Sequence, residues 1–170
     1  MKKLIKITLA LLLTNVTFGQ ELPQLTLTQN GVEPIVVDVK EKTAQELYQK
    51  ALNWVQETYK NPDEVLKANI TNEKIRFNGY KQHAWSWKTM GMKQTVDMEY
   101  TIEVSFKDGK YRFEYTIGQF WTQQKVKALY TTNNFYKKDG SIRGAYENSP
   151  AEIDATMNEL HKSFYNYVTG

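Results

Sequence analysis

Cysteine is absent from this chain of 170 residues, and proline occurs only four times. Without cysteine, the chain cannot form a disulfide framework, a zinc–cysteine site or an iron–sulfur cluster, and it has no thiol nucleophile. It also lacks internal repeats and any linker-like stretch that would separate two domains. The composition that remains, with 41% hydrophobic and 24% charged residues, is typical of one ordinary globular domain.

Long hydrophobic runs are scarce as well, and the clearest one lies at the N-terminus. A lysine-rich start leads into an uncharged run over residues 7–20, which is too short to cross a bilayer because a spanning helix needs about 20 apolar residues. This pattern predicts a secretory signal peptide at residues 1–19. We therefore expect an exported chain, periplasmic or extracellular and soluble, with no transmembrane segment after signal cleavage.

The sequence has little excess charge once the predicted signal peptide is set aside. Its formal net charge of +3 comes from Lys2, Lys3 and Lys6, and beyond them 19 basic side chains balance 19 acidic ones. A neutral chain has no electrostatic surplus with which to attract the phosphates of nucleic acid. We therefore expect no nucleic-acid partner.

Residues 20–34 predict an N-terminal arm or hairpin that precedes the main domain. Leucine and threonine alternate there, and Asn30 with Gly31 forms a strong signal for a two-residue turn, since both central residues of a type I′ turn need positive φ. Pro34 has no N–H to donate to a strand ladder, so this arm is expected at an edge. Residues 35–170 are then expected to form a single α+β domain.

Two capping motifs predict helices. The stretch from Thr43 to Glu46 matches a capping box, in which the threonine hydroxyl and the glutamate carboxylate each satisfy a free backbone N–H. Apolar residues follow at helical spacing, and Trp54 at the centre of this stripe is expected to anchor the helix in the core. Ser149 to Glu152 gives a second capping box, with a proline, that opens a C-terminal helix.

Between these helices the apolar period changes from 3.6 to 2, which predicts four strands. The clearest hairpin turns at Asp108-Gly109 and pairs Val104 with Phe113, so that its apolar side chains share one face. With a first strand beginning at Ile35, the order is β-α-ββββ-α. We expect an α+β fold, with an antiparallel sheet of about five strands and two helices packed on one face.

The first helix and the clear hairpin carry a resemblance to a known family. Their motifs read Thr43-Ala44-Gln45-Glu46-Leu47 through Ala51-Leu52-Asn53-Trp54-Val55, and Val104-Ser105-Phe106-Lys107-Asp108-Gly109-Lys110-Tyr111-Arg112-Phe113. In these motifs, residues 37–117 resemble a bacterial family of secreted domains of unknown function with a TATA-binding-protein-like (TBP-like) fold. The resemblance implies that fold and a place in the periplasm or outside the cell. It implies no activity and assigns no functional residue.

One pair of carboxylates offers an enzymatic alternative. The hairpin register places Glu103 opposite Glu114, with Cα atoms about 5.5 Å apart, and two carboxylates that close can separate their pKa values and act as acid and base. The simpler interpretation is an exposed pair relieved by Arg112. Because no other catalytic motif or metal-ligand spacing is present, we expect no catalytic residue, metal or cofactor.

Histidine and tryptophan residues on one predicted strand allow two interpretations. His83, Trp85 and Trp87 share one face of that strand, where they form either part of the core or an exposed platform for a ligand. His161 is expected at the surface or flank of the C-terminal helix. Neither histidine has metal-ligand spacing to a carboxylate pair.

The stretch 119–148 has no clear period and is expected to be a long loop, and loops of this length are often functional or mobile. Its aromatic residues are our candidate contacts for a ligand or partner, on the expectation that they form an exposed cluster. The candidates are Trp121, Tyr130, Phe135 and Tyr136.

These observations favour a secreted, non-enzymatic domain that binds an envelope protein, a peptide or a small molecule through the open face of the sheet and the 119–148 loop. One alternative is a hydrolase that acts on envelope polysaccharide or peptide with Glu103 and Glu114. The other alternative is a structural or assembly subunit.

Overall fold

The computed structural model describes residues 21–170, so the predicted signal peptide lies outside the described residues. The elements in chain order are β1 (Leu27–Thr28), β2 (Gly31–Val32), β3 (Ile35–Asp38), α1 (Ala44–Thr58), α2 (Pro62–Val65), β4 (Leu66–Ile70), β5 (Lys74–Thr89), β6 (Met92–Lys107), β7 (Lys110–Trp121), two short 3₁₀ helices η1 (Thr132–Phe135) and η2 (Gly144–Tyr146), and α3 (Ser149–Thr169).

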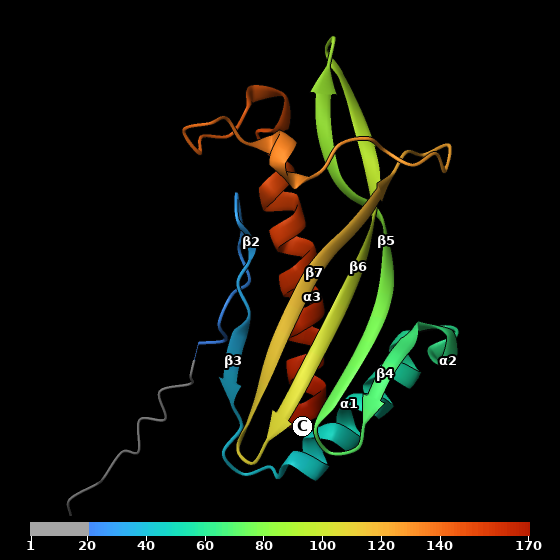
Figure 1. Cartoon of the computed structure of the whole chain (residues 1–170), viewed down its shortest axis with the longest axis vertical. Coiled ribbons are helices and arrows are strands. Elements are labelled where there is room, and N and C mark those ends of the chain that lie inside the picture. The colour runs from blue at the N-terminus through green and yellow to red at the C-terminus, as the bar shows by residue number, and fades with distance from the viewer. Residues whose placement is uncertain (1–20) are drawn as a thin grey trace, which may run out of the picture.

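Five of these strands form one antiparallel sheet in the order β3-β7-β6-β5-β4. Helices α1 and α3 contact each other and lie on the same face of this sheet (Figure 1). The expected α+β fold and its β-α-ββββ-α order are therefore confirmed. Among residues 21–170, no helix is both long enough and apolar enough to cross a membrane.

The β6–β7 hairpin has the register that its turn predicts. Val104 pairs with Phe113 and Ile102 with Tyr115, and all four side chains are buried. Their neighbours on the opposite face are partly or fully exposed, as alternation in a half-buried sheet requires. This hairpin gives the sheet its helix-facing side and leaves the other side open.

Helix α1 begins and packs as predicted. The Thr43 hydroxyl accepts the Glu46 N–H at 3.2 Å, and the Glu46 carboxylate accepts the Thr43 N–H at 2.7 Å. Trp54 is buried against Phe77 and Phe164, with ring centroids 5.8 and 5.3 Å away. The interpretation of Trp54 as the core anchor of the helix is confirmed.

The second predicted capping box does not form. Helix α3 has Asn148 as its N-cap residue, without a side-chain capping bond. The hydroxyl of Ser149 donates instead to the Ser86 carbonyl at 2.7 Å, and Glu152 accepts from the Ser86 hydroxyl at 2.8 Å. Strand β5 supplies these partners, so the polar groups attach the helix to the sheet rather than cap it.

The N-terminal arm is a hairpin, but its register differs by one residue from the prediction. Leu27 pairs with Val32, so Gln29 and Asn30 form the turn and Gly31, with φ of 103°, follows it. This register buries Leu27 against α3, where the Asp154 carboxylate accepts its N–H at 2.7 Å. Contact with the helix therefore decides the register, and the arm forms its own two-stranded sheet.

Strands β5 and β6 are longer than their sequence pattern indicates. They continue past the sheet as a two-stranded ribbon that turns at Met90 and Gly91 (Figure 1). A β-bulge between Lys81 and Trp85 interrupts the alternation, which is why the pattern does not reveal one continuous strand. The segment 119–148, which was expected to be a long loop, passes beside the base of this ribbon and leads to α3 (Figure 1).

Candidate functional site

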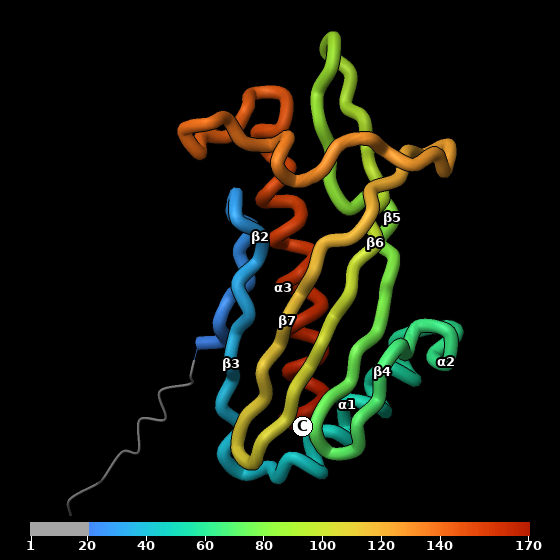
Figure 2. Tube along the Cα trace, viewed as in Figure 1, coloured from blue at the N-terminus to red at the C-terminus, as the bar shows by residue number. Residues whose placement is uncertain are grey.

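One end of the molecule has more basic than acidic side chains, whereas the rest of residues 21–170 has the opposite balance. The β5–β6 ribbon (residues 81–97) and the connection 119–148 meet at the end opposite the β6–β7 turn, as Figure 2 shows, and together we call them the basic end. It carries eight basic side chains and three acidic ones, namely Lys81, Lys88, Lys93, Lys125, Lys127, Lys137, Lys138 and Arg143 against Asp97, Asp139 and Glu147. The rest of residues 21–170 has 11 basic and 16 acidic side chains. The neutral total therefore conceals an excess of positive charge at the basic end and an equal excess of negative charge in the rest of residues 21–170.

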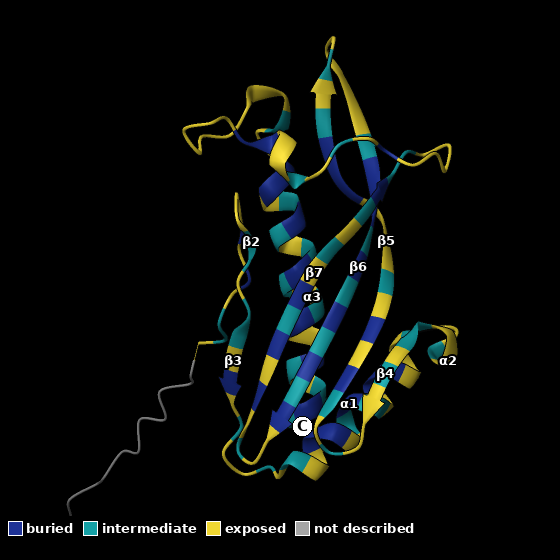
Figure 3. Cartoon of the chain, viewed as in Figure 1, coloured by how far each residue is buried: buried dark blue, intermediate teal, exposed yellow. Residues whose placement is uncertain are grey.

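The basic end also exposes apolar side chains. Of the eight large hydrophobic residues that are exposed in residues 21–170, five lie there, namely Met90, Met92, Val126, Leu129 and Ile142. Met90 at the ribbon tip and Leu129 in the connection are each 96% exposed. Figure 3 shows the exposed tip of the ribbon and the exposed turns of the connection. Exposed apolar groups beside lysines are typical of a binding surface.

The ribbon tip is a tight turn with an unusual residue in it. Met90 has φ of 47° and Gly91 has φ of 78°, the positive values that a type I′ turn requires. Glycine accepts such a φ freely, and asparagine or aspartate tolerates it, but methionine does so at a cost. Folding alone therefore gives no reason for methionine at this position.

Aromatic side chains surround the base of the ribbon. The Trp87 ring stacks on Tyr146 with centroids 6.1 Å apart and meets the edge of Tyr130 at 6.1 Å. All three side chains are half-buried. Below them Trp85 is only 1% exposed and contacts Phe135 with ring centroids 4.8 Å apart. The connection is thus held on the ribbon by an aromatic cluster of its own.

A buried carboxylate fixes the first turn of the connection to the sheet. Asp97 is 2% exposed. It accepts hydrogen bonds from Lys125 Nζ at 2.6 Å, the Tyr80 hydroxyl at 2.7 Å and the His83 N–H at 2.8 Å. Burial raises the pKa of Asp97, but these donors outweigh it and lower the pKa to about 2. Asp97 is therefore ionised near neutral pH and acts as a positioning group for this turn.

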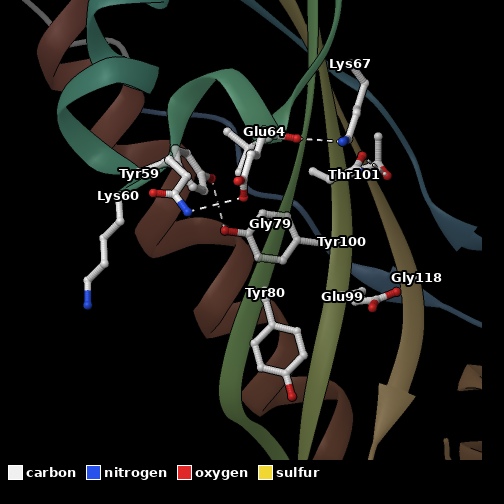
Figure 4. Close-up of a pocket in the computed structure, with 13 residues that line it drawn as sticks. Tyr59, Lys60, Glu64, Lys67, Gly79, Tyr80, Glu99, Tyr100, Thr101 and Gly118 are labelled. Atoms are coloured by element: carbon white, nitrogen blue, oxygen red, sulfur yellow. Dashed lines mark hydrogen bonds between the residues drawn. The ribbon is translucent and has the colours of Figure 1, made fainter.

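A hollow lies beside β5, between α2 and the sheet, with a volume of about 630 Å³. At its inner end the hydroxyls of Tyr59 and Tyr100 are 3.0 Å apart (Figure 4). The Tyr100 ring lies over Gly79, where a Cβ would come within 2.1 Å of it. Burial raises the pKa of both tyrosines. Both basic and acidic side chains line this groove, including Lys60, Lys67, Glu64 and Glu99, so it selects no ligand by charge.

The four aromatic residues that the sequence nominated do not form an exposed cluster. Trp121 and Tyr130 are half-buried at the basic end. Phe135 is 0% exposed and stacks with Phe120, and the Tyr136 hydroxyl donates to the Leu27 carbonyl at 3.0 Å. The expectation of an exposed cluster is therefore wrong for Phe135 and Tyr136, which belong to the core. Residues in 3₁₀ helices and turns have no period from which their burial could be read.

The carboxylate pair has the predicted register but not a shared environment. Glu103 lies opposite Glu114 in the β6–β7 ladder. Lys74 binds Glu103 at 2.6 Å, and Arg112 binds Glu114 at 2.6 Å. Each carboxylate thus has its own cation on the open face of the sheet. Among residues 21–170, no group of three or more histidine, aspartate or glutamate side chains is placed to hold a metal ion.

The bulge in β5 separates the residues that were expected to share a face. His83 has φ of 51° and is exposed, while Trp85 is core and Trp87 is half-buried. The core interpretation is therefore confirmed for Trp85 and wrong for His83. The sequence did not reveal the bulge, because apolar and polar residues alternate regularly both before and after it.

His161 is also placed differently from the prediction. It is 0% exposed in the interface between α3 and the sheet, where its Nε2 lies 3.0 Å from the Tyr111 hydroxyl. Its ring centroid lies 4.8 Å from that of Phe113. Burial lowers the pKa of His161 to about 4. The residue is a neutral core group, and the polar character of histidine explains why the sequence pattern assigned it to the surface.

The fold described above defines a domain of the TBP-like class. The sequence profile of a domain of unknown function with a TBP-like fold, DUF4468, matches residues 35–121, and the chain belongs to this family. The match stops at the end of β7, so the connection and α3 lie beyond it.

Two crystal structures support the same fold. A DUF4468 family protein from Bacteroides ovatus is 12% identical with a TM-score of 0.64, and the match covers 82% of this chain and 86% of that one. A TBP-like protein from Parabacteroides distasonis is 12% identical with a TM-score of 0.61, covering 81% and 92%. At this identity the likeness shows the fold alone. No curated protein matches the chain.

Proposed function

We propose that this domain is an exported, non-enzymatic binding module whose basic end binds an anionic partner in the cell envelope. The observation that carries the proposal is the separation of charge, because eight basic side chains gather with five exposed apolar residues at one end. A concentrated field of one sign steers a partner of the opposite sign and raises its rate of association. This corrects the expectation from total charge, which treated the chain as electrostatically neutral.

Partner binding agrees with the way the connection is built. Lys125 ties the first turn of the connection to Asp97, and the Arg143 Nε donates to the Tyr136 carbonyl at 2.9 Å. The remaining lysines of the connection project from a segment that is already held in place. A surface that is ordered before binding loses little conformational entropy when the partner arrives.

The hydrolase alternative has less support from the geometry. Glu103 and Glu114 are each bound by a separate cation and do not line the groove between α2 and the sheet. A general acid needs a raised pKa, which usually comes from a desolvated pocket. No such pocket encloses this pair, so we favour binding over hydrolysis.

Reversing three charges at the basic end should weaken the binding of an anionic probe. The variant Lys127→Glu, Lys137→Glu, Lys138→Glu changes three exposed residues without a salt bridge in the structure. We expect its affinity for immobilised heparin, measured at low salt, to fall by about tenfold or more. Affinity of the native chain should fall as salt is added.

A matched control carries the same change of charge at the other end. Lys40, Lys107 and Lys110 are exposed near the β6–β7 turn, and reversing them should reduce heparin affinity far less. Equal losses in both triple variants would show that only net charge matters. Absence of heparin binding by the native chain would reject the proposed function.

A further inference from the structure

We propose that the anionic partner is a lipid surface, and that the tip of the β5–β6 ribbon inserts into it through Met90. This inference rests on the proposed function, since it identifies the partner of the same basic end. It is carried by three features of the ribbon: an apolar tip, flanking cations and an aromatic base.

The tip presents apolar groups where folding does not call for them. Met90 has positive φ and is 96% exposed, and Met92 is 58% exposed. A residue in a costly conformation is a reason to look for function, provided the strain is observed. Methionine is flexible and apolar, so it adapts to an irregular apolar environment. The ribbon thus offers an insertion point that extends beyond the rest of the domain (Figure 1).

Cations and aromatic rings follow the tip in the order that a membrane interface favours. Lys88 and Lys93 lie opposite each other in the ribbon next to the tip, and both are exposed, although Lys93 also lies 3.4 Å from the Glu152 carboxylate. Trp87 and Tyr146 come next, stacked and half-buried. Lysine binds anionic headgroups and extends its apolar stem into the interface, while tryptophan and tyrosine prefer the headgroup level.

The distribution of the other exposed apolar residues favours lipid over a protein partner. Val126, Leu129 and Ile142 lie on the connection rather than on the ribbon. They are separated along the chain and adjoin basic residues, because Lys125 and Lys127 flank Val126 and Arg143 follows Ile142. A fluid lipid surface accommodates separate apolar points between anionic headgroups, whereas a protein partner requires a continuous complementary surface.

Met90→Asn tests the insertion without endangering the fold. Asparagine suits the first central position of a type I′ turn, so this variant should be at least as stable as the native chain. Its affinity for phosphatidylcholine vesicles that contain phosphatidylglycerol, measured by co-sedimentation, should fall about ten- to a hundredfold, because one buried methionine side chain is lost. Met90→Leu should bind nearly as the native chain does. Vesicles of phosphatidylcholine alone should bind the native chain weakly.

The control variant is Ile70→Asn, which removes a side chain that is 50% exposed on β4, away from the basic end. It should leave vesicle binding unchanged. Met90→Asn should also retain heparin binding, because the basic side chains remain.

Equal vesicle binding by the native chain and Met90→Asn would overturn the insertion. If the native chain binds heparin but not anionic vesicles, the lipid assignment fails while the proposed function stands. Self-association of the native chain that Met90→Asn abolishes, without vesicle binding, would instead assign the tip to a second copy.

Discussion

Replacing Trp85 with alanine is expected to lower the free energy of unfolding by about 3–5 kcal/mol, the range for a large aromatic residue removed from a core. Trp85 is 1% exposed, and its ring contacts Phe120, Tyr130 and Phe135 with centroids 5.1, 5.9 and 4.8 Å away. These partners come from β7 and the connection, so one side chain holds both against the ribbon. Urea unfolding followed by circular dichroism would measure the loss.

Trp85→Phe is the matched control for this prediction. It retains an aromatic ring in the same cluster and removes an indole N–H that has no hydrogen-bond partner in the structure. The loss should therefore be much smaller than for alanine. If Trp85→Ala and Trp85→Phe unfold at similar urea concentrations, the aromatic cluster does not stabilise the basic end as we describe.

Acidification should destabilise the native chain through His161, with a maximum loss of about 3 kcal/mol from this group. Its pKa is about 4 in the folded chain, below the ordinary value of 6.5. The unfolded chain therefore binds a proton first as the pH falls. The contribution of His161 to stability is complete above pH 6.5 and decreases as the pH falls from there to about 4.

The difference between the native chain and His161→Phe isolates this effect from other titrating groups. Phenylalanine places a ring beside Phe113 and Tyr111 but removes the proton-binding site. It also leaves the Tyr111 hydroxyl without its partner, which costs stability at every pH. Between pH 7 and pH 4 the unfolding free energy should thus fall less in the variant than in the native chain. The difference between the two decreases should be about 3 kcal/mol. Parallel pH profiles would contradict a buried neutral histidine.

Interactions between residues close together in the sequence made two elements of the fold predictable. The capping box from Thr43 to Glu46 and the turn at Asp108-Gly109 depend on residues that are neighbours in the sequence. Their geometry is determined before distant parts of the chain meet, so the sequence alone predicts it. The family resemblance rests on the same two elements, and the fold class that it implies is confirmed.

Distant contacts decide the features that were missed. Leu27 sets the register of the arm because it is buried against α3, and Ser149 binds β5 instead of capping its own helix. The bulge before Trp85 interrupts the alternation of β5, but no glycine or proline between Lys81 and Trp85 marks its position. Each of these outcomes depends on a partner far away in the sequence, which periodicity does not identify.

The candidate site was hidden for a similar reason. Residues 81–97 and 119–148 are separated by a full strand pair, and each segment alone has an ordinary content of lysine. Only the sheet topology brings them to one end, where their charges add. The aromatic residues of 119–148 were recognised, but Phe135 and Tyr136 turn inward because the connection needs a core of its own. Charge, rather than aromatic exposure, therefore identifies the binding end.

Hydrogen exchange in the presence of saturating heparin tests the location of the binding end most directly. We expect slower exchange of backbone amides in peptides that cover residues 86–95 and 122–147, where ligand contact reduces opening of the ribbon tip and the connection. Peptides from β3, α1 and the β6–β7 turn should exchange as in the free chain. Protection confined to the open face of the sheet around Glu103 and Glu114 would contradict the assignment.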